Sequence, residues 1–200
     1  MAKQLIISIS REYGSGGHEL AERIAEHFSL AFYDRNILQE IADEKQVNHD
    51  KLQQYDELPK RRFMSRTVRG MSNSPEENIA NMQFEYLRKK AERGDSFVIV
   101  GRCSEYVLEN YDCMIPIFIR GDMKARTERI MRVRNVTREE AVSIITRHDK
   151  TRKAYHNSHC PVQWGDSSVY DLTMNSSKLG IDGTLDILYD YVEKRIAAEE

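Results

Sequence analysis

The chain has few cysteines and no long apolar run. Its 200 residues include three cysteines, Cys103, Cys113 and Cys160, and no C-x-x-C pair. This usage argues against a disulfide framework and favours a reducing compartment, so we expect a cytoplasmic protein. No apolar run approaches the roughly 18 residues of a membrane span, and residues 1–3 lead straight into a predicted strand. We therefore expect no signal peptide and no membrane partner.

The chain also lacks a strong net charge, which is only −2. Because the domain is not basic overall and shows no recognition-helix or aromatic-platform motif, we expect no nucleic-acid partner. The charge is nevertheless uneven: residues 120–153 hold eleven Lys and Arg against five Asp and Glu. Such asymmetry is typical of a face that holds an anionic ligand, and equally of a solvated helix surface. The sequence does not determine the oligomeric state.

Residues 5–28 combine a strand, a glycine-rich turn and a helix. The β-branched run at residues 5–9 predicts a buried strand. It is followed by the sequence GSGG at residues 14–17 and by a helix with one apolar face. Glycines let the backbone approach an anion, and the first N–H groups of the helix point at it. The segment therefore predicts an oxyanion site between residue 14 and His18.

This turn lacks two chemical groups of the Walker pattern G-x-x-x-x-G-K-[ST]. With Gly16 as the last glycine of the pattern, Gly17 takes the lysine position and His18 the Ser/Thr position. Arg11, at the position of the first glycine, is the best-placed substitute cation, although it could equally pair with Glu12 or Glu19. The turn thus has the backbone layout of a phosphoryl-transfer site without its usual lysine and hydroxyl.

Four more apolar runs alternate with helical patterns, at residues 31–33, 97–100, 114–119 and 169–174. Runs that are apolar throughout indicate parallel strands covered on both faces. With the first strand they predict an α/β fold, a doubly wound parallel sheet of about five strands flanked by helices. Ligand sites in such a fold lie at the carboxyl ends of the strands.

The helices are predicted from caps and apolar periodicity. We expect Asp34 to cap a helix over residues 35–45, and a helix to run from Pro75 to about residue 93. Three further helices are expected: one over residues 122–133, one that begins at the capping box of Thr137 and Glu140, and one over residues 181–196. An irregular flap is expected at residues 155–168.

Polar residues follow three of the predicted strands, at the edge where the strands end. They are the glycine turn, Gly101-Arg102 and Asp34-Arg35. A helix end with Arg147, Asp149 and Arg152 leads into the flap. Each has a plain structural explanation, since a glycine turn allows tight packing and Asp149 with Arg152 can form an i,i+3 ion pair. Taken together, in their order along the chain, they favour a phosphate site. Arginine suits such a site because its planar guanidinium group binds two phosphate oxygens at once.

The order of these motifs resembles that of the cytidylate kinase-like family, relatives of the nucleoside monophosphate kinases in the P-loop kinase superfamily. The resemblance covers nearly the whole chain. It implies a single domain with a core of residues 1–46, 94–146 and 169–200, a helical monophosphate-binding insert of residues 47–93, and a lid of residues 147–168. Its most specific segments are SREYGSGG (10–17), FYDRNIL (32–38), VIVGRCSEYVL (98–108), Asp149-x-x-Arg152 and YDLTMNSS (170–177).

By this resemblance the protein is a nucleotide kinase that transfers the γ-phosphate of ATP to a small acceptor, CMP or dCMP. Arg102 is expected to contact the substrate phosphate, Asp149 the substrate sugar, and Arg152 phosphates across the lid. Mg²⁺ is expected to arrive with the nucleotide, since it keeps several waters and few protein ligands, and no metal held by the protein is predicted. The predicted site residues are Arg11, Arg102 and Arg152 for catalysis; Gly14, Ser15, Gly16, Gly17, His18, Arg126, Arg129 and Arg147 for phosphate or nucleotide binding; and Asp34, Arg35, Gln83, Arg102 and Asp149 for the acceptor.

The chain departs from the family pattern outside the turn as well. Cys103 replaces the acid of a Gly-Arg-Asp motif, and residues 145–146 replace the first Arg-Asp of the lid signature. Three alternatives therefore stay open: a non-catalytic nucleotide or phosphate sensor, a kinase for another small metabolite, and an interaction module with an empty cleft, which leaves the clustering of arginines unexplained. We interpret His156-x-x-His159-Cys160 as part of a polar, solvated lid loop rather than a zinc site, because zinc needs a fourth ligand and Asp166 is the one near candidate.

Overall fold

A parallel sheet of five strands forms the centre of the protein, in the order β2-β5-β1-β6-β7. The computed structural model describes residues 3–34, 36–46, 48–56, 58–59, 67–68, 71–72 and 74–198. All neighbouring strands of the sheet pair in parallel, which confirms the predicted doubly wound α/β fold. The strands are β1 (Ile6–Arg11), β2 (Ala31–Tyr33), β5 (Phe97–Val100), β6 (Met114–Arg120) and β7 (Leu172–Asn175).

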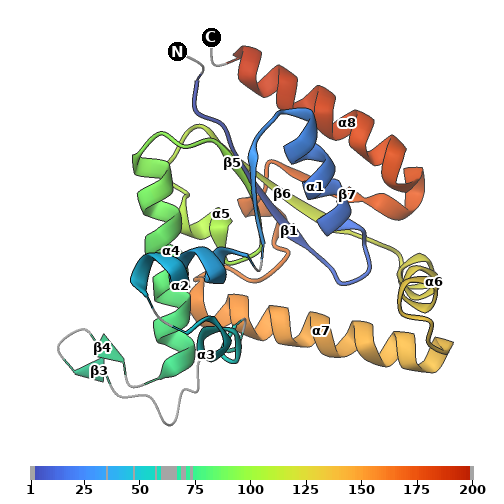
Figure 1. Ribbon diagram of the computed structural model, residues 1–200. Coiled ribbons are helices and arrows are strands. Elements are labelled where there is room, and N and C mark those ends of the chain that lie inside the picture. The colour runs from blue at the N-terminus through green and yellow to red at the C-terminus, as the bar shows by residue number, and fades with distance from the viewer. Residues whose placement is uncertain are drawn as a thin grey trace.

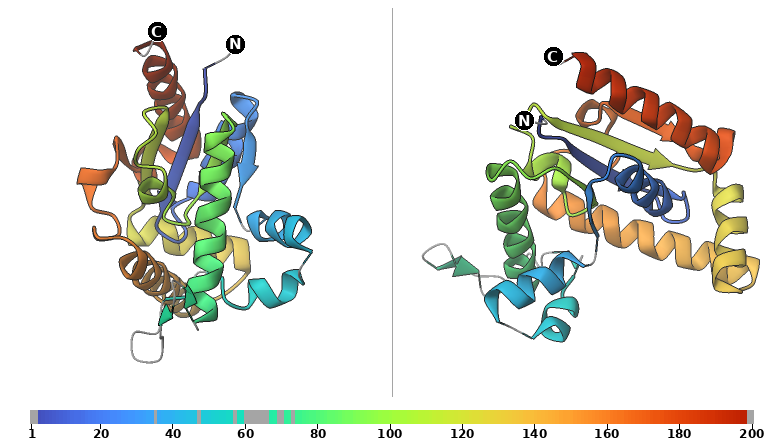
Figure 2. Two further views of the ribbon diagram at one scale, coloured as in Figure 1. Left: turned by 90° about the vertical axis from the view of Figure 1, so that its left-hand side faces the viewer. Right: turned by 45° about the horizontal axis from the view of Figure 1, so that its top comes forward.

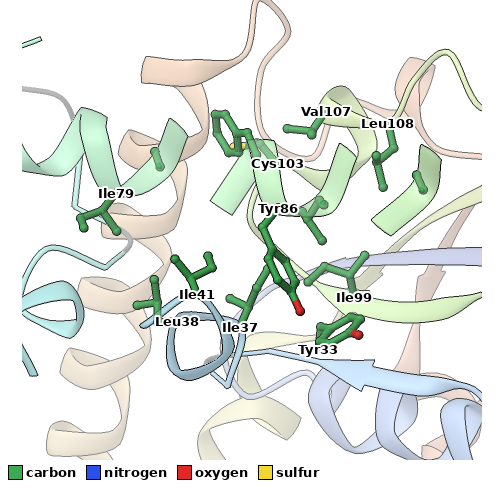
Figure 3. Close-up of a cluster of buried hydrophobic side chains, with 14 of the residues drawn as sticks. Tyr33, Ile37, Leu38, Ile41, Ile79, Tyr86, Ile99, Cys103, Val107 and Leu108 are labelled. Atoms are coloured by element: carbon green, nitrogen blue, oxygen red, sulfur yellow. The ribbon is translucent and has the colours of Figure 1, made fainter. Parts of the chain in front are cut away.

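Helices cover both faces of this sheet (Figure 1), which explains why its strands are apolar throughout. On one face α1 (Gly17–His27) and α8 (Ser176–Ala198, kinked at Gly180) pack against Ile7 and Ile9 of β1. On the other face lie α2 (Ile37–Lys45), α4 (Pro75–Glu92) and α5 (Ser104–Val107). Figure 3 shows part of this second cluster, with Tyr33, Ile37, Tyr86 and Ile99 among its labelled side chains.

Two helices, α6 (Met123–Arg134) and α7 (Arg138–His159), pack on each other through Ile130, Ala141 and Ile145. The predicted capping box of Thr137 and Glu140 is present at the start of α7. Figures 1 and 2 show α7 passing along the edge of the sheet at which β1 ends. The long helix thereby brings residues from the second half of the chain to the glycine turn.

The predicted insert, residues 47–93, lies partly outside the described residues. Its described part contains α3 (His49–Gln53), the paired strands β3 (Thr67–Val68) and β4 (Met71–Ser72), and α4. The sequence did not predict the two short strands. Among the described residues, no helix is both long and apolar enough to cross a membrane.

The predicted flap at residues 155–168 is wrong at its beginning, because α7 continues to His159. Cys160, the residue after the helix, is extended with φ −111° and ψ 144°. Proline disfavours the helical conformation of the residue before it, so Pro161 ends the helix at this point. The last turn of α7 therefore carries His156 and places it inside the protein rather than in a solvated loop.

Two other predicted boundaries are also wrong. The last strand begins at Leu172 and not at residue 169, because Ser167–Val169 form a 3₁₀ turn in which Asp166 accepts the Ser168 N–H at 3.0 Å. Asp34 does not cap α2, which begins at Ile37 after Asn36. The Asp34 carboxylate instead faces His18 and Arg11, and this contact belongs to the candidate site.

Candidate functional site

The glycine turn has the geometry of an anion-binding loop. Gly14 and Gly16 have φ values of +81° and +84°, which favour glycine over residues with a side chain. Gly16 is the N-cap of α1 and has no side chain that could bond to the first N–H groups of the helix. Arg11 and Arg152 border a cavity of about 470 Å³ that runs along the turn and also reaches His18. Its charged lining consists of three arginines, Arg11, Arg129 and Arg152, and three glutamates, Glu12, Glu19 and Glu22. The start of α1 and these arginines therefore border the same space.

Arg11 fills the space that a lysine at position 17 would need. A Cβ atom built on Gly17 would lie 2.6 Å from the Cβ and 3.0 Å from the Cγ of Arg11. Arg11 itself is buried, and its Nη2 lies 3.8 Å from Oδ1 of Asp34. The two glutamates near the turn contact other arginines, Glu12 with Arg126 and Glu19 with Arg129. The side chain of Arg11 thus lies against position 17, and its role as the substitute cation of the turn stays a prediction.

His18 and Asp34 form an ion pair at the mouth of the turn, with 3.0 Å between Nδ1 and Oδ2. The hydrogen bond to Asp34 raises the pKa of His18 more than partial burial lowers it. Burial alone would raise the pKa of Asp34, but the His18 hydrogen bond and the charges of Arg11 and Arg102 outweigh it and lower the pKa to about 2. The Asp34 carboxylate is therefore ionised at neutral pH and faces three nitrogen-bearing side chains.

Arg102 follows β5 in a constrained turn. Arg102 and Cys103 have φ values of +62° and +53°, a conformation that costs residues with a side chain about 1–3 kcal/mol each and is concentrated at functional sites. The buried Arg102 donates from Nη2 to Oδ2 of Asp56 at 2.9 Å. The other oxygen of Asp56 accepts from Nε2 of Gln83 at 3.1 Å. These contacts connect the end of β5 to the described part of the insert.

The three arginines predicted to be catalytic lie around one small cavity. Arg11, Arg102 and Arg152 line it together with Ser10, Gly101 and Trp164. Arg152 donates to the carbonyl of Arg11 at 3.3 Å, and its guanidinium lies 5.4 Å from the ring centroid of Tyr13. They come from β1, the end of β5 and α7, so the fold brings together cations that are far apart in the sequence. A polyanion is the ligand that such a concentration of positive charge attracts.

Arg126 and Asp149 lie in a partly buried network that holds the first half of the turn. Asp149 accepts the N–H of Tyr13 at 2.7 Å and pairs with Arg126. Arg126 also donates to the carbonyl of Tyr13 at 2.9 Å and lies 3.0 Å from Glu12. Burial raises the pKa of Asp149, although the Tyr13 N–H and Arg126 oppose this. In this structure the two residues position the turn.

The remaining predicted residues are spread around the turn. Arg129 and Arg126 line a second cavity of about 310 Å³ that also contains Gly14 and Ser15. The hydroxyl of Ser15 donates to the carbonyl of Glu12 at 2.8 Å. Arg147 is exposed on α7, and Arg35 lies outside the described residues. The turn is thus bordered by one cavity toward α7 and another toward α6 and α8.

Three oxygen-bearing side chains next to the turn already have protein partners. The carboxylates of Glu12 and Asp34 are each engaged by cationic side chains. The Ser15 hydroxyl is used within the turn. Magnesium takes carboxylates, phosphates and waters as ligands, so this arrangement fits an ion that arrives with a bound phosphate compound.

Sequence reasoning missed Asp56 and Glu105. Asp56 lies in a segment without periodicity, so no local pattern links it to Arg102. Glu105 is 3% exposed and accepts from Ser10 at 3.2 Å. Its burial has no signal in the sequence, since an acid in the first turn of a helix is ordinarily solvated.

His156 and Cys160 are buried, which corrects the prediction of a polar, solvated loop. Nε2 of His156 lies 2.7 Å from Oε1 of Glu105. Burial alone would lower the pKa of His156, but hydrogen bonds with Cys160 and Glu105 raise it to about 10. A hydrogen bond from Cys103, together with His156, lowers the pKa of Cys160 to about 7 against the effect of burial. Asp166, the one near candidate for a fourth zinc ligand, is exposed and caps the 3₁₀ turn.

Comparison with known sequences gives a consistent set of relatives. The profile of the cytidylate kinase-like family matches residues 6–178. The cytidylate kinase of Pyrococcus horikoshii is 28% identical over 187 residues, which cover 92% of this chain and 86% of the relative. The cytidylate kinase of Staphylothermus marinus is 24% identical over 191 residues, which cover 95% of this chain and 97% of the relative.

Comparison with solved structures supports the same fold. The crystal structure of an uncharacterized protein from Eubacterium ventriosum superposes with a TM-score of 0.76 at 35% identity and covers 95% of this chain and 99% of that chain. Shikimate kinase from Bacteroides thetaiotaomicron superposes with a TM-score of 0.55 at 12% identity and covers 94% of this chain and 98% of that chain. At this identity the second likeness shows a shared fold alone.

Proposed function

Because the chain belongs to the cytidylate kinase-like family, we propose that it is a nucleotide kinase that transfers the γ-phosphate of ATP to CMP or dCMP. The observation that carries this proposal is the convergence of Arg11, Arg102 and Arg152 at one edge of the sheet, where Arg11 and Arg152 also border the cavity along the glycine turn. Phosphoryl transfer requires in-line positioning of the two substrates, cations around the transferred group, and a site from which water is excluded. Arginines suit this task because they keep their charge and bind two phosphate oxygens at once.

The two cavities beside the turn suggest where the two substrates bind. The cavity that contains Arg129 and Arg132 opens toward α6 and α8, and we assign it to the ATP donor. The acceptor then lies on the opposite side, between Arg102 and the insert. Magnesium bound to the ATP phosphates supplies charge neutralisation for the transferred group. Arg11 stands between the two sides and contributes a fixed positive charge where a lysine would otherwise do so.

Asp56 binds the guanidinium group of Arg102, which we assign to the phosphate of the acceptor. Arg102 and Asp56 lie 2.9 Å apart, and Gln83 holds the second oxygen of Asp56. An incoming phosphate would replace Asp56 at Arg102, since both are oxyanions that accept from the same nitrogen. Asp56 and Gln83 would then face the sugar or base of the acceptor. This exchange makes the described part of the insert the region that selects the acceptor.

The test is an assay of ADP release with ATP, Mg²⁺ and a panel of nucleoside monophosphates. We expect kcat/KM to be highest with CMP or dCMP, and product analysis to find the corresponding diphosphate. ADP release from none of the monophosphates would contradict the proposal. ADP release with a different small metabolite would support a kinase function but show that the acceptor is not CMP or dCMP.

One observation favours a non-catalytic nucleotide sensor as the second candidate. The turn has no lysine, and the residue at the metal-binding hydroxyl position, His18, is paired with Asp34. Calorimetric titration with ATP and Mg²⁺ separates the two functions. Binding without any turnover in the acceptor panel would support the sensor, whereas binding with turnover would exclude it.

A further inference from the structure

A second cluster of reactive side chains lies behind the three arginines. Glu105, His156 and Cys160 each offer one ligand atom, and the three atoms lie within 4.8 Å of one another. The residues are 3%, 3% and 7% exposed. Glu105 belongs to α5, whereas His156 and Cys160 stand four residues apart at the end of α7. The N–H of Cys160, the residue after the helix, donates to the carbonyl of His156 at 2.8 Å, which keeps the two residues together at the helix end.

The distances suit a small divalent ion. Zinc binds sulfur at about 2.3 Å and nitrogen or oxygen at about 2.0–2.2 Å, so the ligands of a tetrahedral ion are separated by roughly 3.3–3.7 Å. His156 and Glu105 are 2.7 Å apart and need to separate by less than about 1 Å to reach that range. The thiol of Cys103 hydrogen-bonds to Cys160 and supplies a further sulfur next to the three ligands.

The surrounding residues hold the ligands in ligating orientations. Ser10 donates to Oε2 of Glu105 at 3.2 Å, and the hydroxyl of Tyr170 donates to Oε1 at 3.4 Å. Nδ1 of His156 lies 3.4 Å from Oδ1 of Asn157, which also accepts the N–H of Trp164 at 2.9 Å. A partner on Nδ1 directs Nε2 toward the ligand position. Outer contacts of this kind orient the ligands of metal centres.

A cavity of about 420 Å³ reaches this cluster from the face of the molecule beside α5. Its charged lining consists of one arginine, Arg195, and four carboxylates: Glu105, Glu109, Asp112 and Asp171. The excess of negative charge attracts cations, and Glu105 belongs both to this lining and to the cluster. The Glu105 side of the cluster therefore borders an acidic cavity that attracts cations.

We propose that Glu105, His156 and Cys160 bind one zinc-class transition-metal ion. A set of one thiolate, one imidazole and one carboxylate favours zinc or cobalt over magnesium and calcium, which prefer oxygen ligands. The ion would link the end of α7, which carries Arg152, to α5, which begins two residues after Arg102. Its role is to fix the position of the long helix relative to the end of β5. This site is separate from the magnesium that accompanies ATP.

The test uses metal-stripped wild-type protein under reducing conditions. Titration with Co²⁺ should reach one equivalent per chain and produce a thiolate-to-cobalt charge-transfer band together with the visible bands of a tetrahedral ion. Zn²⁺ should then displace the cobalt and raise the melting temperature. A wild-type protein that binds no stoichiometric Co²⁺ or Zn²⁺ would overturn the proposal, whatever the variants do.

Variants identify the ligands. Changes in outer contacts cost about 10–100-fold in metal affinity, so we expect Asn157→Ala to weaken Zn²⁺ binding within this range. Cys160→Ser removes a ligand and should weaken it by more than about 100-fold, with loss of the charge-transfer band. Cys113→Ser is the matched control, since this thiol donates to Gln4 outside the cluster, and should bind as wild type does. An unchanged affinity and spectrum in a folded Cys160→Ser variant would contradict the site.

Discussion

At the scale of single residues, Arg11 and Gly17 share the space at the start of the turn. The side chain of Arg11 takes the volume that a lysine at position 17 would occupy, so glycine at position 17 and arginine at position 11 depend on each other. This dependence is steric: the Cβ atoms would be 2.6 Å apart. The pair is therefore expected to behave as a unit when either residue is changed.

The steric dependence predicts the behaviour of Gly17→Ala. The added methyl group must push against the backbone-fixed Cβ of Arg11, so we expect a loss of about 1–3 kcal/mol in the free energy of unfolding. Urea denaturation of the variant measures this loss. The Arg11→Gly/Gly17→Ala double variant should lose less stability than the sum of the two single variants. Additive losses would contradict the close approach.

The ion pair of Asp34 with His18 and Arg11 predicts a dependence of stability on pH. The folded-state pKa of Asp34 is about 2 against 3.8 for the unfolded chain, so its stabilisation is present above 3.8 and is lost as pH falls toward 2. The difference of about 1.8 pKa units corresponds to about 2 kcal/mol. Wild type should exceed Asp34→Asn in stability by about this amount at pH 6, and the difference should shrink between pH 4 and pH 2. A difference that is constant with pH would exclude the ion pair as its source.

At the scale of elements, α7 connects the turn to the rest of the site. It packs on α6 at one end, carries Arg152 past the turn, and ends in the Glu105–His156–Cys160 cluster. Because Arg152 lies beside a cavity and is only partly buried, its side chain is expected to serve ligand binding more than folding.

Arg152→Ala tests the role of this helix. Loss of one preorganised donor to a developing charge typically lowers the rate by about 10²–10³, and we expect this fall in kcat with little change in melting temperature. Lys153→Ala is the matched control, because Lys153 is the exposed neighbour on the same helix and should keep the wild-type rate. If the Arg152→Ala variant melts many degrees lower but binds nucleotide normally, Arg152 has a structural role instead.

The elements also show what the sequence could predict. The buried strands were recognisable because each is an apolar run covered on both faces, and this pattern fixes the fold class. The end of α7 was missed although its signal, Pro161, is in the sequence: the helix continues up to the residue before the proline. Local patterns thus determine where elements lie better than where they end.

The site was predictable only in part. Arg11, Arg102 and Arg152 were recognisable from their places after strands or at a helix end, and the fold brings them together. Asp56 and Glu105 were not, because their partners, Arg102 and His156, are 46 and 51 residues away in the chain. Such contacts depend on tertiary packing and leave no periodic pattern in the sequence.

At the scale of the whole molecule, a nearly neutral chain concentrates positive charge at one edge of its sheet. The net charge is −2, yet arginines from β1, the β5 end and α7 line one cavity. Polyanion binding at such an edge is driven by charge and is screened by salt. The helix start alone contributes only about 0.3–1 kcal/mol at an exposed site, so the arginines must supply most of the attraction.

This charge distribution predicts a steep salt dependence of nucleotide binding. The ATP affinity should fall by about tenfold or more between roughly 0.05 M and 0.5 M NaCl, where the screening length shortens severalfold. Calorimetric titration measures the affinity, and adenosine, which lacks phosphates, serves as the control ligand whose binding should change little. Equal salt dependence of ATP and adenosine would contradict the role of the arginines.

The most direct test of the central claim is the turnover number of Arg11→Ala with ATP, Mg²⁺ and the best acceptor. We expect kcat to fall by about 10²–10³ while the protein remains folded, because Arg11 is proposed to supply the charge that the turn otherwise lacks. Arg11→Lys should recover part of the rate, since it restores a cation of similar reach. A folded Arg11→Ala variant with the wild-type kcat would contradict the claim that this arginine replaces the lysine of the turn.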